Sequence, residues 1–189
     1  MILKNEGSYE AAIDTLYRAA WDYEFRSASY FQLAQLLSLQ GNYDNALEAV
    51  EESLIVNSMN INALCLKTSL LRRTENHEQA VQEAEKIILI DPLSKYAVNE
   101  LRMIHDQQDE LDTARENETV LKKLLRDYPE NYLELAVDYM NSGLILEATQ
   151  LLQIARASGT AGLSDYPSIH YYLGYLHHLK GETQAAREY

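Results

Sequence analysis

Residues 27–60 read SASYFQLAQLLSLQGNYDNALEAVEESLIVNSMN, and the rest of the chain repeats the pattern of this 34-residue stretch. Its first half carries apolar side chains at helical spacing, namely Tyr30, Leu33, Ala34 and Leu37. The segment GNYD at 41–44 then interrupts the pattern with typical turn residues. Ala46, Val50 and Ser53 resume the same stripe in the second half. The stretch therefore predicts a helix, a tight turn and a second helix.

The pattern recurs in register along the chain. A small residue that would let two helices approach closely occupies one phase of every copy: Ala12, Ala46, Ala80, Ala114, Ala148 and Ala186. Their separations are 34 residues four times and then 38. The turn phase holds Gly7, Gly41, Gly143 and Gly181, but Glu75 and Asp109 stand in two copies. The four extra residues lie within 157–165, where SGTAG indicates a loop.

This pattern resembles the tetratricopeptide repeat (TPR), in which a bulky residue, Leu, a small residue, an aromatic residue or Leu, Gly, Ala, a large apolar residue, Ala and Pro follow in order. The resemblance implies an all-α fold, a right-handed superhelical solenoid of antiparallel helix pairs. We expect one TPR-like domain over 1–189 with about five repeats, incomplete at both ends. Its parts would be a partial repeat 1–26, repeats 27–60, 61–94, 95–128 and 129–162, and a partial repeat 167–189.

The copy at 95–128 departs most from the pattern. Arg102 stands where a small residue belongs, and Glu118 stands where a large apolar one belongs. A charge at either place is costly when it is buried without a partner. We therefore favour a local rearrangement that lets both side chains reach water over a buried Arg102–Glu118 pair.

Composition limits the classes of partner. The chain has 29 acidic and 16 basic residues, a formal charge of −13, which disfavours binding to nucleic acid phosphates or to an anionic membrane. It has no apolar run long enough to cross a bilayer. Cys65 is the single cysteine, so no disulfide can form within the chain and a reducing compartment is compatible. A cytoplasmic location is the default expectation, and the compartment is otherwise left open.

Both ends of the sequence fall inside repeats, so we expect the chain to be an excerpt of a longer protein, in which case the lack of a signal peptide is uninformative. Exposed terminal helices could also self-associate. The segments YPENYLELAVDYMNSGLILEA and YPSIHYYLGYLHHLKGETQAA show a weaker resemblance to TPR tracts near the C-terminus of large bacterial proteins. Those proteins also carry a β-rich, carbohydrate-associated domain.

In TPR proteins the first helices of successive repeats line a concave groove that holds a peptide or a helix. The resemblance implies that the groove-facing positions here are Phe31, Gln35, Cys65, Ser69, Asn99, Met103, Leu133, Val137, Tyr171 and Tyr175. Arg72 and Arg73, the only adjacent arginines, would add a basic spot suited to an amphipathic segment bearing an acidic group. The alternative is that the apolar members are packing residues and that Arg72 and Arg73 solvate a helix end. No clamp of lysines and asparagines for chaperone tails is visible.

Catalytic signals are weak. His177 and His178 are adjacent, and adjacent residues on a helix point about 100° apart, which makes a poor metal chelate. We expect no metal and no cofactor. The chain is therefore interpreted as a noncatalytic protein–protein interaction scaffold that binds a peptide or helix. The alternatives are a structural spacer or dimerisation arm of a larger bacterial protein, including one that handles glycans, and an enzyme of unsuspected type.

Overall fold

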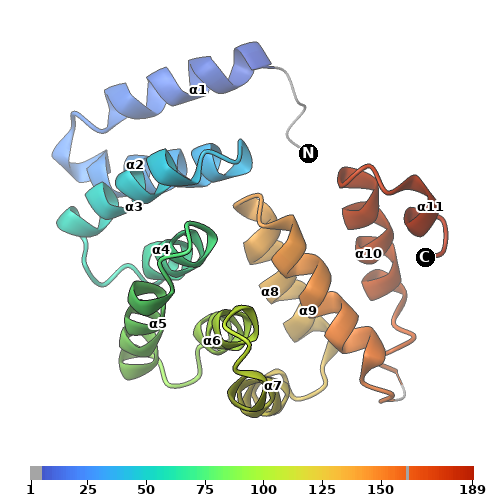
Figure 1. The fold of residues 1–189 in the computed structure, drawn as a ribbon. Helices are drawn as coiled ribbons and strands as arrows, with labels where there is room; N and C mark the ends of the chain where they lie inside the picture. Colours follow the sequence, from blue (N-terminus) through green and yellow to red (C-terminus); the bar gives the residue numbers. More distant parts are fainter. Residues whose placement is uncertain (1–5, 161) are drawn as a thin grey trace.

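The computed structural model describes residues 6–160 and 162–189, and every regular element in this part of the chain is a helix (Figure 1). Consecutive helices pack as antiparallel pairs, which stack into a solenoid. The elements are α1 (Glu6–Ala19), α2 (Tyr23–Leu39), α3 (Tyr43–Val56), α4 (Ile61–Arg73), α5 (His77–Ile90), α6 (Lys95–Gln107), α7 (Leu111–Leu125), α8 (Pro129–Asn141), α9 (Ile145–Ala157), α10 (Pro167–Leu179) and α11 (Thr183–Ala186). The predicted all-α solenoid is confirmed.

The inner helices begin at residues suited to a helix N-terminus. Side-chain oxygens of Asp22, Asn60 and Ser94 accept backbone hydrogen bonds at the starts of α2, α4 and α6, which satisfies amides that have no partner inside the helix. Pro129 and Pro167 open α8 and α10, where their fixed φ angle suits the first turn. Capping by Asp22 starts α2 at Tyr23, four residues before the repeat pattern begins at residue 27.

The turns between paired helices keep one geometry even where glycine is missing. Gly41, Gly143 and Gly181 have φ angles of 75°, 71° and 77°. Glu75 and Asp109 stand at the same phase and have φ angles of 61° and 60°. The backbone at these two residues therefore adopts a left-handed conformation that glycine adopts without steric cost.

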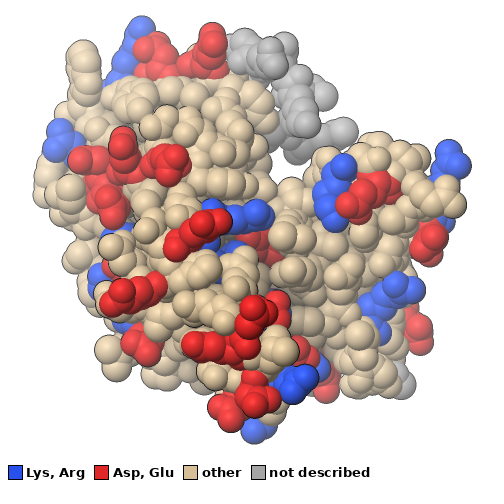
Figure 2. Space-filling view, viewed as in Figure 1, with Lys and Arg blue, Asp and Glu red and all other residues tan. Residues whose placement is uncertain are grey.

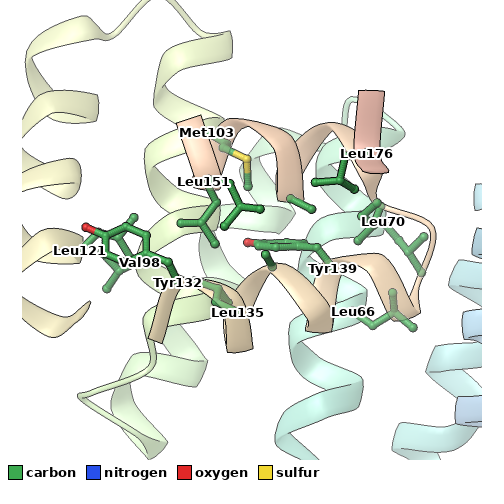
Figure 3. Packing of buried hydrophobic residues seen from close by; sticks show 14 of the residues in the cluster. Leu66, Leu70, Val98, Met103, Leu121, Tyr132, Leu135, Tyr139, Leu151 and Leu176 are labelled. Atoms are coloured by element: carbon green, nitrogen blue, oxygen red, sulfur yellow. The ribbon is translucent and has the colours of Figure 1, made fainter. Parts of the chain in front are cut away.

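The phase of small residues explains how closely the paired helices pack. Ala46, Ala80 and Ala148 are fully buried where the second helix of a pair crosses the first. Figure 3 shows the larger cluster around α8, in which Tyr139 lies between Leu70 of α4 and Leu151 of α9. The largest cluster thus runs between stacked helices from α2 to α10, and two smaller clusters lie between α4, α5 and α6.

The stacking changes direction between α7 and α8. Arg126 and Asp127 both have left-handed φ angles, 55° and 53°, directly after α7. The chain then returns toward α2: Ser38 Oγ donates to the carbonyl oxygen of Ser142 at 2.6 Å, and Gln35 Nε2 lies 3.4 Å from Ser142 Oγ. The solenoid thus closes on itself, because the end of α8 touches a helix more than 100 residues earlier.

Arg102 corrects one expectation. Its side chain is buried, so it does not reach water in the way the sequence suggested. Arg102 Nε donates to Asn99 Oδ1 at 3.0 Å, Nη2 has no partner among the described residues, and burial lowers the pKa of the guanidinium. Glu118 is half-buried and pairs with Lys122 at 2.6 Å. No ion pair joins Arg102 to Glu118 within the described part of the chain.

Candidate interaction surface

A hollow of about 450 Å³ lies on the inner side of the solenoid between α2, α4, α6 and α8. Three of the predicted groove residues line it: Phe31 and Gln35 from α2, and Cys65 from α4. The superhelical closure adds residues from α8 that a regular solenoid would hold farther away. Other lining residues include Ile61, Asn62, Asp91, Leu93, Lys95, Tyr96, Glu134, Asp138 and Asn141.

The hollow is acidic. Asp91, Glu134 and Asp138 line it with one cation, Lys95, whose Nζ lies 2.7 Å from Glu134 Oε2. Burial raises the pKa of Asp138, and the charge of Glu134 raises it further while Lys95 acts in the opposite direction. Acidic and basic side chains are also spread over the face of the molecule that Figure 2 shows. The hollow therefore favours a cationic group over an anionic one.

Cys65 lines the hollow, and its thiol is expected to be unreactive. Its side chain is buried, and burial, followed by the charges of Glu100 and Asp138, raises the pKa of the thiol far above its usual range. A thiol that stays protonated at neutral pH is a poor nucleophile and a poor metal ligand. Cys65 therefore acts as a small apolar group beside Phe31.

Two predicted groove residues, Ser69 and Asn99, are buried in a chain of internal contacts. Ser69 Oγ lies 2.7 Å from Tyr96 Oη, and Asn99 Nδ2 donates to Tyr139 Oη at 2.9 Å. The rings of Tyr96 and Tyr139 pack with their centroids 4.5 Å apart. These polar groups therefore join α4, α6 and α8 to one another and have no free face for a partner.

Arg72 and Arg73 are also engaged within the chain. Glu147 of α9 receives both: Arg73 Nε and Nη2 each lie 2.7 Å from its carboxylate oxygens, and Arg72 Nη2 lies 2.6 Å from Oε1. Arg72 Nε donates to Glu100 at 2.8 Å. Burial opposes ionisation of both partners, but the ion pairs outweigh it, so the pKa of Glu147 is lowered and that of Arg72 is raised.

The consequence is that the basic spot inferred from the sequence is neutralised by two carboxylates. Arg72 is buried and Arg73 is half-buried, with its guanidinium 5.5 Å from the ring centre of Tyr43. An acidic segment would have to displace Glu147 to reach them. These internal ion pairs therefore argue against a free basic spot for an acidic group.

The remaining predicted residues lie apart from the hollow. Met103 is buried in the core, and Leu133 and Val137 are half-buried on α8. Tyr171 is exposed on α10, with its ring edge-on to Tyr172, and Tyr175 is half-buried. Their role in binding stays a prediction.

Sequence reasoning missed the carboxylates of the hollow. Glu134 and Asp138 each follow a predicted groove position, Leu133 and Val137, by one residue. The closure of the superhelix brings these neighbouring positions of α8 to the hollow. The sequence does show that Glu134 and Asp138 are one turn apart on α8. Their position in the hollow, however, depends on the closure of the superhelix, which the repeat pattern does not predict.

The described part of the chain shows no group of three or more His, Cys, Asp or Glu side chains arranged to hold a metal ion. Within the same residues, no helix combines the length and the apolar character that a bilayer crossing requires.

Comparisons with known proteins agree with this architecture. Residues 27–54 match the sequence model of the tetratricopeptide repeat. The crystal structure of MamA is similar, with a TM-score of 0.59, 16% identity, and coverage of 78% of this chain and 86% of that one. A thermophilic TPR protein of Thermus thermophilus has a TM-score of 0.54, 19% identity, and coverage of 85% of this chain and 86% of that one.

A tetratricopeptide repeat protein from Parabacteroides merdae has a TM-score of 0.53, 15% identity, and coverage of 96% of this chain and 77% of that one. At these identities the likeness concerns the fold. The chain therefore matches the tetratricopeptide repeat over residues 27–54 and shares the helical solenoid fold of these structures.

Proposed function

We propose that the chain binds a peptide segment in the hollow between α2, α4, α6 and α8. TPR proteins are in general noncatalytic scaffolds for protein–protein interaction, and the fold supports that general role here. The observation that carries the finer proposal is the hollow itself, which combines apolar walls with uncompensated carboxylates. Recognition sites of this kind take an apolar anchor and orient it through a few polar groups.

The ligand is expected to carry an apolar side chain next to Lys or Arg. Phe31 and Leu93 offer apolar contact, and the side chain of Leu93 is largely exposed. Asp91 and Asp138 have no basic partner among the described residues, whereas Glu134 already pairs with Lys95. A ligand cation would lower the pKa of the Asp138 carboxyl, which partial desolvation raises, and so favour its ionised form.

The test is selection from a displayed random peptide library against the immobilised chain, followed by affinity measurement on the selected peptides. We expect enrichment of peptides with adjacent aromatic or aliphatic and basic residues. The variant Asp91→Lys/Asp138→Lys should weaken binding by about tenfold or more, since it inverts both unpaired charges. The matched control Glu78→Lys/Glu116→Lys makes the same net charge change at exposed positions outside the hollow and should have little effect.

Equal loss of binding in both variants would mean that net charge and not the hollow attracts the peptides. Selection of no peptide by the folded chain would contradict the proposal and favour the spacer or dimerisation arm. Circular dichroism of each variant establishes that it is folded.

A further inference from the structure

Large apolar side chains are exposed at equivalent positions of three successive repeats. Trp21, Ile55 and Leu89 are spaced by 34 residues and are 76–85% exposed. A second series follows four residues later, Phe25, Met59 and Leu93, with the same spacing and 57–69% exposure. We call these six residues the apolar ridge.

The repeat register places the ridge along one margin of the solenoid. Ile55 and Leu89 lie in the last turns of α3 and α5, and Phe25 lies in the first turn of α2. The other three, Trp21, Met59 and Leu93, lie in the connections that follow α1, α3 and α5. These three connections follow one another along the left and lower margin of the view in Figure 1. The ridge meets the hollow at Leu93, which belongs to both surfaces.

The exposure is not an effect of the chain end. The helices α3 and α5, which carry Ile55 and Leu89, each pack between two neighbouring helices of the stack. A single exposed leucine or isoleucine needs no explanation, but an apolar series repeated in register marks an interaction surface. The equivalent positions of the next repeat are Lys123 and Asp127, so the ridge is limited to three repeats.

Carboxylates beside the ridge lack basic partners within the described residues, whereas the nearby cations are engaged in contacts within the chain. Asp22, Glu24, Glu52 and Asp91 lie next to or within one turn of ridge residues and have no basic partner among the described side chains. The nearby cations are already engaged in contacts within the chain: Arg18 pairs with Asp14 at 2.8 Å, Lys86 lies 3.4 Å from Glu83, and Arg26 Nε donates to Ala20 O at 3.1 Å.

We propose that the apolar ridge binds a cationic amphipathic helix of another protein, with its apolar face on the ridge and its basic residues against these carboxylates. An anionic membrane would be repelled by the same carboxylates. A second copy of the chain, with a formal charge of −13, would bring like charges together. A helix of about 18 residues would extend about 27 Å along the surface.

The experiment uses the fluorescence of Trp21, which is the only tryptophan in the chain and lies in the ridge. The probe is a Leu/Lys amphipathic peptide of about 18 residues, compared with a scrambled peptide of the same composition and a Leu/Glu amphipathic peptide. We expect the Leu/Lys peptide to shift the emission to shorter wavelength in a saturable titration. The scrambled and Leu/Glu peptides should bind at least about tenfold more weakly.

The variant Ile55→Ser/Leu89→Ser keeps Trp21 and should weaken binding of the Leu/Lys peptide by about tenfold or more. Its control, Leu111→Ser/Val120→Ser, removes two exposed apolar residues of α7 outside the ridge and should match the parent within about twofold. The variant Asp138→Lys separates the two surfaces, because Asp138 lines the hollow and does not lie beside the ridge. It should leave the ridge affinity within about twofold of the parent, since Asp22, Glu24, Glu52 and Asp91 remain.

Three results would overturn the proposal. The first is an emission spectrum that the Leu/Lys peptide leaves unchanged, or that the scrambled peptide shifts equally. The second is the same shift with anionic vesicles. The third is a concentration-dependent dimer in sedimentation that Ile55→Ser/Leu89→Ser abolishes, since that result would assign the ridge to a second copy of the chain.

Discussion

Glu147 is a buried carboxylate that pairs with two arginines of α4. Its carboxylate accepts bonds from Arg72 and Arg73, and Arg72 also bonds Glu100, so one acidic side chain of α9 holds the end of α4. A buried ion pair contributes little net stability compared with an apolar replacement, but removing one partner leaves the other charge uncompensated. The effect of substituting Glu147 should therefore be large and should depend on pH.

Glu147→Gln is expected to lower the free energy of unfolding at pH 7 by about 3 kcal/mol. The pKa of Glu147 is lowered in the folded chain, so its stabilising effect is complete above its ordinary value of 4.5 and is lost as pH falls through the folded pKa. The difference between parent and variant should therefore narrow in acid. Urea unfolding at several pH values measures it.

The control for this series is Glu52→Gln, which changes an exposed carboxylate without a basic partner among the described residues. Its effect should stay within about 0.5 kcal/mol at every pH. A constant difference between parent and Glu147→Gln from pH 7 to pH 3 would contradict an ionic role for Glu147.

Glu75 and Asp109 stand where other repeats have glycine, and both have left-handed φ angles. Glu75→Gly should stabilise the chain by about 0.5 kcal/mol, because relief of the strain exceeds the entropy that glycine adds to the unfolded state. Asp109→Gly should stabilise the chain by a smaller amount, since aspartate tolerates a left-handed φ angle better than glutamate does. Thermal unfolding of both variants shows which substitution stabilises the chain more. A larger gain for Asp109→Gly would contradict this account.

At the scale of the helices, the periodic apolar pattern was sufficient to predict the pairs. Each paired turn and each buried alanine such as Ala46 or Ala148 follows from contacts between residues close in sequence. The hollow was only partly predictable. Phe31, Gln35 and Cys65 face it by virtue of their repeat phase, whereas Asp138 lies there because α8 returns to α2.

That return depends on the α8–α9 turn. At Gly143 a Cβ atom would lie 2.7 Å from Leu39 Cα, a backbone atom that cannot move aside alone. Gly181 has a similar φ angle, 77° against 71°, but a Cβ atom there would meet nothing within 4 Å. The two glycines therefore share the conformational requirement of the turn, and Gly143 alone adds a requirement for close contact.

Gly143→Ala should lower the free energy of unfolding by about 2 kcal/mol more than Gly181→Ala, because overpacking adds to the common backbone strain. Chemical denaturation of both variants gives the difference directly. Gly41→Ala serves as a second control, since it too has a positive φ angle and open space around it. Equal costs at all three positions would show that α2 and the α8–α9 turn are not in close contact in solution.

At the scale of the whole molecule, the closed curvature was not predictable from the repeat pattern. The register specifies how neighbouring repeats pack, but not the left-handed residues Arg126 and Asp127, which redirect the chain after α7. In an ideal solenoid each repeat contacts only its neighbours. Here the contacts of Ser142 with Ser38 and of Glu147 with Arg72 join distant repeats directly.

This closure should couple the stability of α2 to that of α8. In Gly143→Ala, amide hydrogen exchange should accelerate not only in α8 and α9 but also in the second half of α2, around Leu37 and Leu39, because the inserted methyl group pushes these segments apart. In Gly181→Ala the acceleration should stay within α10 and α11, where the turn has no distant partner. Mass spectrometry of exchanged peptides resolves both regions. If Gly143→Ala loosens α8 to α10 while α2 keeps its protection, the chain behaves as an open solenoid with nearest-neighbour coupling, and the closed form does not govern its stability.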